Sequence, residues 1–358
     1  MPRLANSLLR RARKINPLLL LLLRPCRDLQ SAKNELRWLR EYAVENTSSL
    51  TDRGREIPLK LSRYCRQRAR GIPLQYILKS QPFGGLDIRL ETESYTCTFA
   101  ERLLRDPNKQ DSTPSKRSLR ILDLCTGTGC IPLLLHSLLS DQIQDIKILG
   151  IDLSSTAVSL AKENLHYNIQ NHCLKPSAIE QVHFKHGDVL QQKFVGGGTS
   201  GTPYIEEVIA STHPWDILIS NPPYISRHHF ATRTSRSVRN WEPRLALVPP
   251  DTLGFPGSNE IDRSGDVFYP RLLGLCETAE VKTALFEVGD MDQAMRVAEM
   301  AIKSHAWCPS EIEIWRDWVS TPWLNNCPEH VFIEGHSVAV RGEGHGRAVV
   351  LRKGGWSD

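Results

Sequence analysis

Apolar runs and amphipathic stretches alternate along the chain from about residue 119 onward. Short runs rich in Leu, Ile and Val predict buried strands, whereas apolar residues spaced three or four apart predict helices. By these patterns strands are expected at residues 119–124, 146–152, 182–189, 215–219, 282–288, 311–318 and 347–353, and helices at 130–139, 155–168 and 290–305. Because apolar strands alternate with helices, the pattern predicts an α/β fold, with a doubly wound, mostly parallel sheet covered by helices on both faces.

The first 80 residues follow a different pattern, in which helical periodicity dominates. Residues 31–43 place Leu36, Leu39 and Ala43 near one face, and residues 58–70 form a second candidate helix. A hairpin or strand is expected at residues 83–88, followed by a polar linker. The pattern therefore predicts four parts in chain order: a possible presequence over residues 1–27, a small N-terminal helical domain over 28–80, a hairpin and linker over 81–118, and the α/β domain over 119–358.

Charge and cysteine content narrow the class of protein only slightly. The chain carries 45 basic and 40 acidic residues, and its net charge of +5 permits an acidic partner without requiring one. The nine cysteines are scattered and never spaced Cys-x-x-Cys, which argues against a disulfide framework and a zinc site and fits a reducing compartment. The Leu18–Leu23 run is far shorter than the roughly 20 apolar residues of a membrane span, so no span is expected.

The first 27 residues contain seven basic residues and no acidic one. A basic, acid-free and partly amphipathic start is typical of an organellar presequence, which predicts a mitochondrial matrix protein. The alternative is that these residues form a basic first helix of the folded domain, in which case a cytoplasmic location is expected.

A glycine loop follows the first predicted strand of the α/β domain and opens its first helix. It consists of Asp123-Leu124-Cys125-Thr126-Gly127-Thr128-Gly129. The glycines allow a ligand to approach the backbone in front of a helix N-terminus. The third glycine of the dinucleotide fingerprint is absent, and the Asp123 carboxylate would repel a pyrophosphate. That carboxylate could instead attract a cationic sulfonium or amino group.

Acidic residues also follow the next two predicted strands. Asp152, followed by Leu153, ends the second strand, where an acid binds ribose hydroxyls in folds of this kind. Asp188 and Val189 end the third strand, where they could contact an adenine amino group. Because the carboxyl ends of parallel strands share one edge of the sheet, these residues should converge there. Their order predicts an S-adenosyl-L-methionine-dependent methyltransferase.

The fourth strand of this sheet ends in Ser220-Asn221-Pro222-Pro223-Tyr224. Each proline lacks an N–H donor, fixes its own φ and restricts the residue before it to extended geometry. The result is a stiff loop that carries a carboxamide and an aromatic ring. By itself this loop is either an ordinary proline-rich turn or a clamp for a planar amide or amine. Its place beside the predicted cofactor site favours the clamp.

Three further segments make the pattern specific. They are Gly71-Ile72-Pro73-Leu74-Gln75-Tyr76-Ile77-Leu78, Glu242-Pro243 with Ala246-Leu247, and Phe286-Glu287-Val288-Gly289 with Gln293 downstream. With these, the chain from about residue 31 to 353 resembles the HemK/PrmC family, protein-glutamine N5-methyltransferases that modify the Gly-Gly-Gln glutamine of peptide-chain release factors. The resemblance implies a Rossmann-like class I methyltransferase domain, S-adenosyl-L-methionine as cofactor, mitochondrial relatives, and a helical domain that recognises the substrate.

The resemblance also implies roles for individual residues. The catalytic residues would be Asn221, Pro222, Pro223 and Tyr224, and the cofactor-binding residues Asp123, Cys125, Thr126, Gly127, Thr128, Gly129, Asp152, Leu153, Asp188, Val189 and Asn221. Asn221 would exchange hydrogen bonds with the target carboxamide, the Pro222 carbonyl would accept an amide N–H, and Tyr224 would pack against the amide. The partner would be a release factor, without direct contact to nucleic acid, and the enzyme would be a monomer.

The chain departs from the family pattern at two places. Cys125 stands where family members usually have glycine. The family's Pro-Arg-Pro-x-Thr-Glu segment is shortened here, because Ile88 leads almost directly into Glu91-Thr92-Glu93. In relatives that segment helps to wall the cofactor pocket, so its loss predicts weaker binding unless the sequence itself is faulty there.

Two alternatives to this function stay open. A nucleic-acid methyltransferase acting on adenine N6 or guanine N2 would share the Asn-Pro-Pro-Tyr loop, because an exocyclic base amine poses the same orientation problem. Against it, no basic recognition domain follows the loop. The second alternative is an inactive methyltransferase-like protein that binds without catalysing transfer.

Overall fold

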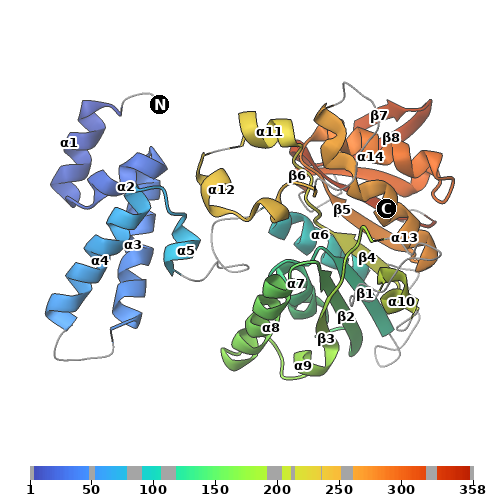
Figure 1. Cartoon of the computed structure of the whole chain (residues 1–358), viewed down its shortest axis with the longest axis horizontal. Coiled ribbons are helices and arrows are strands. Elements are labelled where there is room, and N and C mark those ends of the chain that lie inside the picture. The colour runs from blue at the N-terminus through green and yellow to red at the C-terminus, as the bar shows by residue number, and fades with distance from the viewer. Residues whose placement is uncertain are drawn as a thin grey trace. The chain divides into compact units, whose positions relative to one another are not determined.

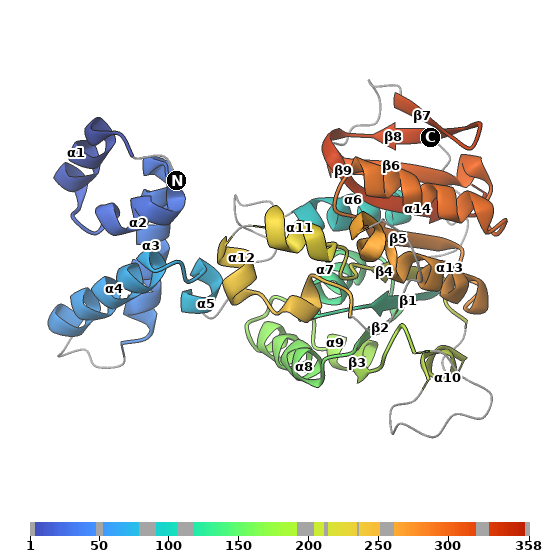
Figure 2. The ribbon, with the colours of Figure 1, turned by 45° about the horizontal axis from the view of Figure 1, so that its top comes forward.

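The computed structural model describes residues 4–47, 53–78, 91–105, 118–191, 204–210, 214–234, 236–250, 261–319 and 329–354 (Figures 1 and 2). The chain divides into two compact units. The first comprises Met1–Pro82 and Thr234–Pro243, and the second comprises Phe83–Arg233 and Arg244–Asp358. The expected hairpin at 83–88 and the polar linker at 106–117 lie outside the described residues, whereas the segment between them contains helix α6 (Glu91–Arg105).

The first unit is helical. Its helices are α1 (Asn6–Ile15), α2 (Leu19–Cys26), α3 (Leu29–Glu45), α4 (Arg53–Ala69), α5 (Leu74–Leu78) and α12 (Arg236–Trp241). Helix α3 begins earlier than predicted, because Asp28 rather than Ser31 caps it and accepts the backbone N–H groups of Gln30 and Ser31. Helices α3 and α4 are joined by a paired contact in which Arg68 donates to both oxygens of Glu35, each at 2.9 Å.

The basic start of the chain forms part of this helical unit. Leu19, Leu22 and Leu23 of α2 are fully buried and share a core with Leu39 of α3 and Leu61 of α4. Residues of α2 therefore pack within the helical unit, which does not decide the compartment of the protein. The presequence stays a prediction, and no helix among the described residues is long and apolar enough to cross a membrane.

The second unit is built on a sheet whose described strands follow the order β3-β2-β1-β4-β5-β9-β6-β8-β7. In chain order these are β1 (Ser118–Leu124), β2 (Asp145–Asp152), β3 (Val182–His186), β4 (Ile217–Ser220), β5 (Thr283–Glu287), β6 (Ile312–Trp318), β7 (Glu329–Ile333), β8 (His336–Arg341) and β9 (Glu343–Arg352). Strands β1 to β5 are parallel to one another where they pair, whereas β9 lies antiparallel between β5 and β6.

Side chains of the central strands alternate between two hydrophobic cores, as the two-residue period of a strand requires. Leu122, Leu218 and Phe286 face α10 (Ile205–Ala210), α13 (Phe268–Thr278) and α14 (Met291–Lys303). Ile121, Ile219 and Leu285 face the other way, toward α6 (Glu91–Arg105), α7 (Cys130–Leu139), α8 (Ser155–Gln170) and α9 (Ala178–Gln181). Figure 2 shows α13 and α14 beside the strands that they cover. The predicted doubly wound α/β fold is thus confirmed.

Most predicted elements are present, with shifted ends. Strand β3 ends at His186 rather than Val189, so Asp188 and Val189 lie in the loop that follows it. Strand β9 begins at Glu343, earlier than expected, because the polar residues before Arg347 continue the pairing with β6. Strands β7 and β8 and helices α6, α9, α10, α11 (Arg227–Thr232), α12 and α13 were not predicted.

Candidate active site

The carboxyl ends of the five parallel strands place the predicted residues in one row. Leu124 of β1 pairs with Ile151 of β2 and with Ser220 of β4, so that Cys125 and Asn221 follow at neighbouring positions. By the same register, Asp152 lies beside Cys125, and Glu287 of β5 lies beside Asn221. This is the switch point of the sheet, because β2 lies on one side of β1 and β4 on the other. Ligands of open α/β sheets bind at such a point.

The glycine loop is folded tightly around the end of β2. Gly127 and Gly129 have positive φ angles of 56° and 79°, and Gly129 is also the residue that precedes α7. The Asp152 carboxylate accepts the Gly127 N–H at 2.8 Å and, through its other oxygen, the Ser154 N–H at 2.8 Å. Asp152 therefore braces the loop in addition to its predicted contact with a ribose.

Cys125 and Thr128 belong to the same glycine loop, and their backbone atoms help to shape it. Cys125 has a φ of 61°, in the left-handed region that glycine adopts without strain, which explains why glycine suits this position in the family. The Thr128 carbonyl accepts a hydrogen bond from the Asn164 carboxamide of α8 at 2.9 Å. Both features concern the backbone of the loop rather than a reactive group.

Asp123 is the most unusual charged group of the loop. It is fully buried at the end of β1, and neither carboxylate oxygen has a hydrogen-bond partner among the described residues; the same holds for the Thr126 hydroxyl. Burial raises the pKa of Asp123 to about 8; the nearby Thr126 side chain lowers it in part, and the neighbouring Asp152 carboxylate adds to the rise. A buried carboxyl without a partner is costly, so this position fits a cationic or hydrogen-bonding ligand group.

The loop after β3 carries the predicted adenine contacts. Asp188 accepts the Leu190 N–H at 2.9 Å, and Val189 is buried. Arg271 of α13, which the sequence did not single out, donates to the Val189 and Gln191 carbonyls at 3.0 and 3.2 Å and pairs with Glu206. It thereby ties this loop to α13. Leu153 is half-exposed after β2.

The Asn221-Pro222-Pro223-Tyr224 loop is anchored before and after its prolines. The Ser220 hydroxyl donates to the Leu124 carbonyl at 2.7 Å, which links the ends of β4 and β1. Both prolines are buried, whereas Asn221 is partly exposed. A partly exposed carboxamide on a fixed backbone is suited to bind a planar group that approaches from outside.

Tyr224 is held at both ends. Its hydroxyl donates to the Glu287 carboxylate at 3.0 Å, and its carbonyl accepts the Gln293 carboxamide at 3.3 Å. Gln293 also donates to Asp266 at 2.8 Å, and Asp266 in turn accepts two hydrogen bonds from Arg296. The ring position is thus set by residues of β5 and α14.

The structure brings all the predicted site residues to the same sheet edge, but their roles in binding remain predictions. Glu287 and Arg271 were missed as functional residues. The signal for Glu287 was available in the sequence, because it is a single carboxylate at the carboxyl end of the apolar run 283–288. Residues 79–90 lie outside the described residues, so the shortened segment before Glu91 stays untested.

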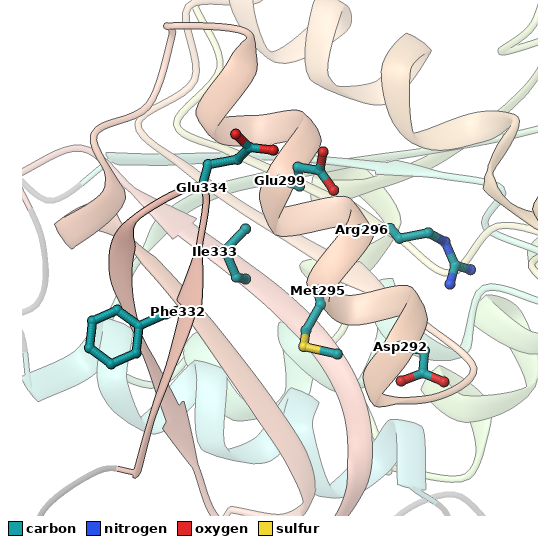
Figure 3. A pocket seen from close by; sticks show the side chains of 7 residues that line it. All are labelled: Asp292, Met295, Arg296, Glu299, Phe332, Ile333 and Glu334. Atoms are coloured by element: carbon teal, nitrogen blue, oxygen red, sulfur yellow. The ribbon is translucent and has the colours of Figure 1, made fainter.

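A separate hollow lies between α14 and β7, away from these loops (Figure 3). It has a volume of about 400 Å³ and is lined by Asp292, Met295, Arg296, Glu299, Phe332, Ile333 and Glu334. The predicted site residues are not among its lining residues. Arg296 links it to the site described above, because Arg296 also binds Asp266.

Alanine substitutions at the two loop glycines should separate stability from cofactor binding. A Cβ at Gly129 would lie 2.7 Å from the Phe184 ring, whereas a Cβ at Gly127 would meet no atom within 4 Å. Gly129→Ala should therefore destabilise the fold by about 2–4 kcal/mol, through crowding added to left-handed strain. Gly127→Ala should cost about 1–2 kcal/mol but place a methyl group in the space kept for a ligand.

Urea unfolding and titration with S-adenosylhomocysteine measure the two effects. Gly129→Ala should show the larger loss of stability. Gly127→Ala should show the larger loss of affinity for S-adenosylhomocysteine, relative to the stability that it loses. Equal affinity losses per unit of stability lost at the two glycines would contradict the assignment of the space beside Gly127 to the cofactor.

Sheet order and loop chemistry together define the class of protein. Five parallel strands, an antiparallel strand inserted after the fifth, and a glycine loop with acids at the first two strand ends characterise a Rossmann-like class I S-adenosyl-L-methionine-dependent methyltransferase. The family model described as N-6 DNA Methylase matches residues 102–253. The chain is a methyltransferase, and S-adenosyl-L-methionine is its cofactor.

Relatives among known proteins narrow the class to a family. The chain is 35% identical over 259 residues to the mitochondrial MRF1 N(5)-glutamine methyltransferase MTQ1 of Saccharomyces cerevisiae, covering 69% of this chain and 68% of the relative. It is 31% identical over 296 residues to the probable MRF1 mitochondrial N(5)-glutamine methyltransferase mtq1 of Schizosaccharomyces pombe, covering 80% and 85%. The release factor glutamine methyltransferase of Chlorobaculum tepidum is 31% identical over 198 residues, covering 52% and 56%.

The chain therefore belongs to the family of release factor N(5)-glutamine methyltransferases. This confirms the resemblance to the HemK/PrmC family, the enzyme class and the cofactor that the sequence motifs indicated.

Proposed function

We propose that this protein transfers a methyl group from S-adenosyl-L-methionine to the side-chain amide nitrogen of the Gly-Gly-Gln glutamine of a mitochondrial release factor. The observation that carries the proposal is the Asn221–Tyr224 loop, in which Tyr224 is held at its hydroxyl and at its backbone carbonyl beside the cofactor loop. The names and mitochondrial location of the yeast relatives support the substrate and the compartment.

The residues of the glycine loop fit the cofactor. The bound cofactor would supply an electrophilic methyl group. Asp123 would face its positively charged portion, because its buried carboxyl has no partner among the described residues. Asp152 would contact the ribose, Asp188 and Val189 the adenine, and the backbone at Gly127 and Gly129 would allow close approach.

An amide nitrogen is a poor nucleophile because its lone pair is delocalised, so the protein's main contribution is orientation. In this proposal the Asn221 carboxamide exchanges hydrogen bonds with the target carboxamide, and the Pro222 carbonyl accepts one of its N–H groups. The Tyr224 ring covers the amide plane. Together these contacts hold the nitrogen in line for transfer.

Purified protein and labelled methyl donor can test the substrate. We expect label to enter a release factor that carries Gly-Gly-Gln and not a variant with that glutamine replaced by alanine. Peptide mass spectrometry should place the methyl group on the glutamine. Label in DNA or ribosomal RNA instead would favour the nucleic-acid alternative that the N-6 DNA Methylase match raises.

The proposal includes a monomeric enzyme that makes no direct contact with nucleic acid. Its only macromolecular partner would be the release factor, recognised in part by the helical unit. Light scattering of the protein alone and of its mixture with release factor should give the masses of one copy and of a one-to-one complex. A stable dimer would contradict this part of the proposal.

A further inference from the structure

Glu287 is a buried carboxylate that the mechanism above does not use. It lies at the carboxyl end of β5, is 3% exposed, and accepts hydrogen bonds from three hydroxyl groups. One oxygen accepts from Tyr224, and the other accepts from Thr92 at 2.8 Å and Tyr95 at 2.5 Å. Hydrogen bonds from hydroxyls to a carboxylate are short, strong and directional.

The contacts of Glu287 join two parts of the chain that are distant in sequence. Thr92 and Tyr95 belong to the first turns of α6, whereas Tyr224 belongs to the loop after β4. The Glu287 carboxylate therefore holds α6 through one oxygen and the loop after β4 through the other. A further contact comes from the backbone of Glu287, whose carbonyl accepts the Tyr269 hydroxyl at 2.9 Å.

The surroundings of Tyr224 leave its ring little freedom. A Cβ at Gly289 would lie 3.1 Å from the ring, so the ring packs directly over that glycine. The hydroxyl is bound by Glu287, and the backbone carbonyl is bound by Gln293. Rotation of the ring about its Cα–Cβ bond would break the hydroxyl contact. The Glu287 hydrogen bond thus holds the ring in this orientation together with its packing over Gly289.

Helix α6 is held independently farther along its length. Arg102 donates to Glu313 at 2.6 Å, and Glu313 also accepts from Trp315 at 2.8 Å and from Arg341 at 2.7 Å. Glu313 is buried in the same sheet, like Glu287, but its hydrogen bonds go to these three residues and not to Tyr224. It provides a matched glutamate for comparison.

From these contacts we propose that Glu287 is a positioning residue, which fixes the direction in which the Tyr224 side chain points, and so the place of its ring beside the target amide, while Thr92 and Tyr95 hold Glu287 in place. The proposal rests on the proposed function, since it assigns Tyr224 to the target amide. It gives the first turns of α6 a role in orienting the substrate.

Steady-state kinetics with release factor as substrate test the proposal. Glu287→Gln and Tyr224→Phe should each lower kcat about 10–100-fold, because misplacement of an orienting group has effects of this size. The double variant should be no slower than the slower single variant, since both changes break the same contact. The Kd for S-adenosylhomocysteine should stay within about twofold of wild type, because neither residue belongs to the cofactor loop.

Variants of the two α6 hydroxyl residues and of the control glutamate complete the set of variants. Thr92→Val and Tyr95→Phe should lower kcat in the wild-type background and have no effect in the Tyr224→Phe background. Glu313→Gln should lower the thermal midpoint without changing kcat of the folded protein. If Glu287→Gln fails to fold, Thr92→Val, Tyr95→Phe and Tyr224→Phe still test the proposal, because each removes a hydroxyl and keeps the ring or the shape of the side chain.

Two kinetic results would overturn the proposal. The first is a Tyr224→Phe variant with wild-type kcat. The second is additive losses in the Glu287→Gln, Tyr224→Phe double variant, which would mean that Glu287 acts apart from the ring.

NMR of ring-labelled tyrosines gives a readout that does not depend on turnover. The Tyr224 signal, identified by its loss in Tyr224→Phe, should shift in Glu287→Gln and not in Glu313→Gln. An unshifted signal in Glu287→Gln would refute the positioning role. Failure of the wild-type protein to methylate release factor would instead refute the proposed function, and the NMR comparison would still decide on Glu287.

Discussion

Replacing Asn221 by alanine is expected to abolish methyl transfer, with kcat at least about 100-fold lower, while S-adenosylhomocysteine still binds measurably. The carboxamide is the partly exposed polar group that the loop presents, and an amide nucleophile depends on such contacts for its orientation. The loop itself should keep its fold in the variant. Its prolines, the Ser220–Leu124 hydrogen bond and both anchors of Tyr224 do not involve the Asn221 side chain.

Single-turnover transfer to release factor measures the loss of catalysis, and calorimetric titration with S-adenosylhomocysteine measures the retained binding. Asn171→Ala is a suitable control, because Asn171 is an exposed asparagine whose side chain bonds the end of α8. The control should keep wild-type rates. Near-normal turnover in Asn221→Ala would refute the assignment of this residue to catalysis.

Replacing Asp123 by asparagine should weaken cofactor binding and, at the same time, stabilise the cofactor-free protein above neutral pH. The carboxylate is expected to bind a cationic part of the cofactor, and loss of a charge-assisted contact costs about 1.5–3 kcal/mol, or roughly 10–150-fold in Kd. Asparagine keeps the shape of the side chain but not its charge.

The stability effect follows from the raised pKa of Asp123. In the folded protein the carboxyl ionises at a pKa of about 8, whereas the ordinary value is 3.8. Between these values the unfolded state loses the proton and the folded state keeps it, so the wild-type free energy of unfolding falls as pH rises, by up to about 1.4 kcal/mol per pH unit. The asparagine side chain does not titrate and would give no such slope. The stability of Asp123→Asn relative to wild type should therefore increase from about pH 4 to about pH 8.

Denaturant unfolding at about pH 4.5, 6 and 8 gives this difference directly, and cofactor titrations give the affinities. Asp188→Asn gives a comparison for binding, because Asp188, whose carboxylate accepts the Leu190 N–H, is also expected to contact the cofactor. A stability difference that does not change with pH would show that folding does not raise the pKa of Asp123 and would contradict this prediction.

The strands of the central sheet were predictable because burial on both faces makes each a continuous apolar run, as in Ile217–Ser220, whose four residues are all buried. Strand β7 follows the opposite rule. It lies at the sheet edge, and its Phe332 is 79% exposed while its first residues are polar, so no burial pattern marks it. Helix α13 is mostly buried, which narrows the polar face that would have revealed a helical period.

The candidate site likewise has features that the sequence could predict and features that it could not. Asp123, Asp152 and Asn221 could be placed together from sequence because parallel strands end at one edge, so that position along each strand fixes position in space. The contacts that orient Tyr224 could not. Thr92 and Glu287 are 195 residues apart, and Tyr224 and Glu287 are 63 apart, and no local pattern encodes a hydrogen bond over such separations.

Strand β9 has a consequence for how the protein is made. It follows every other described strand of the sheet in the chain, yet it lies between β5 and β6 and is the partner of both. During synthesis, or during threading through a narrow import channel, the strand that carries Glu287 must wait with one edge unpaired until residues 343–352 arrive. The enzyme can therefore become active only after nearly its whole length has emerged, and a chain that stops just before this strand would have the complete set of site residues on two sheets that no strand joins.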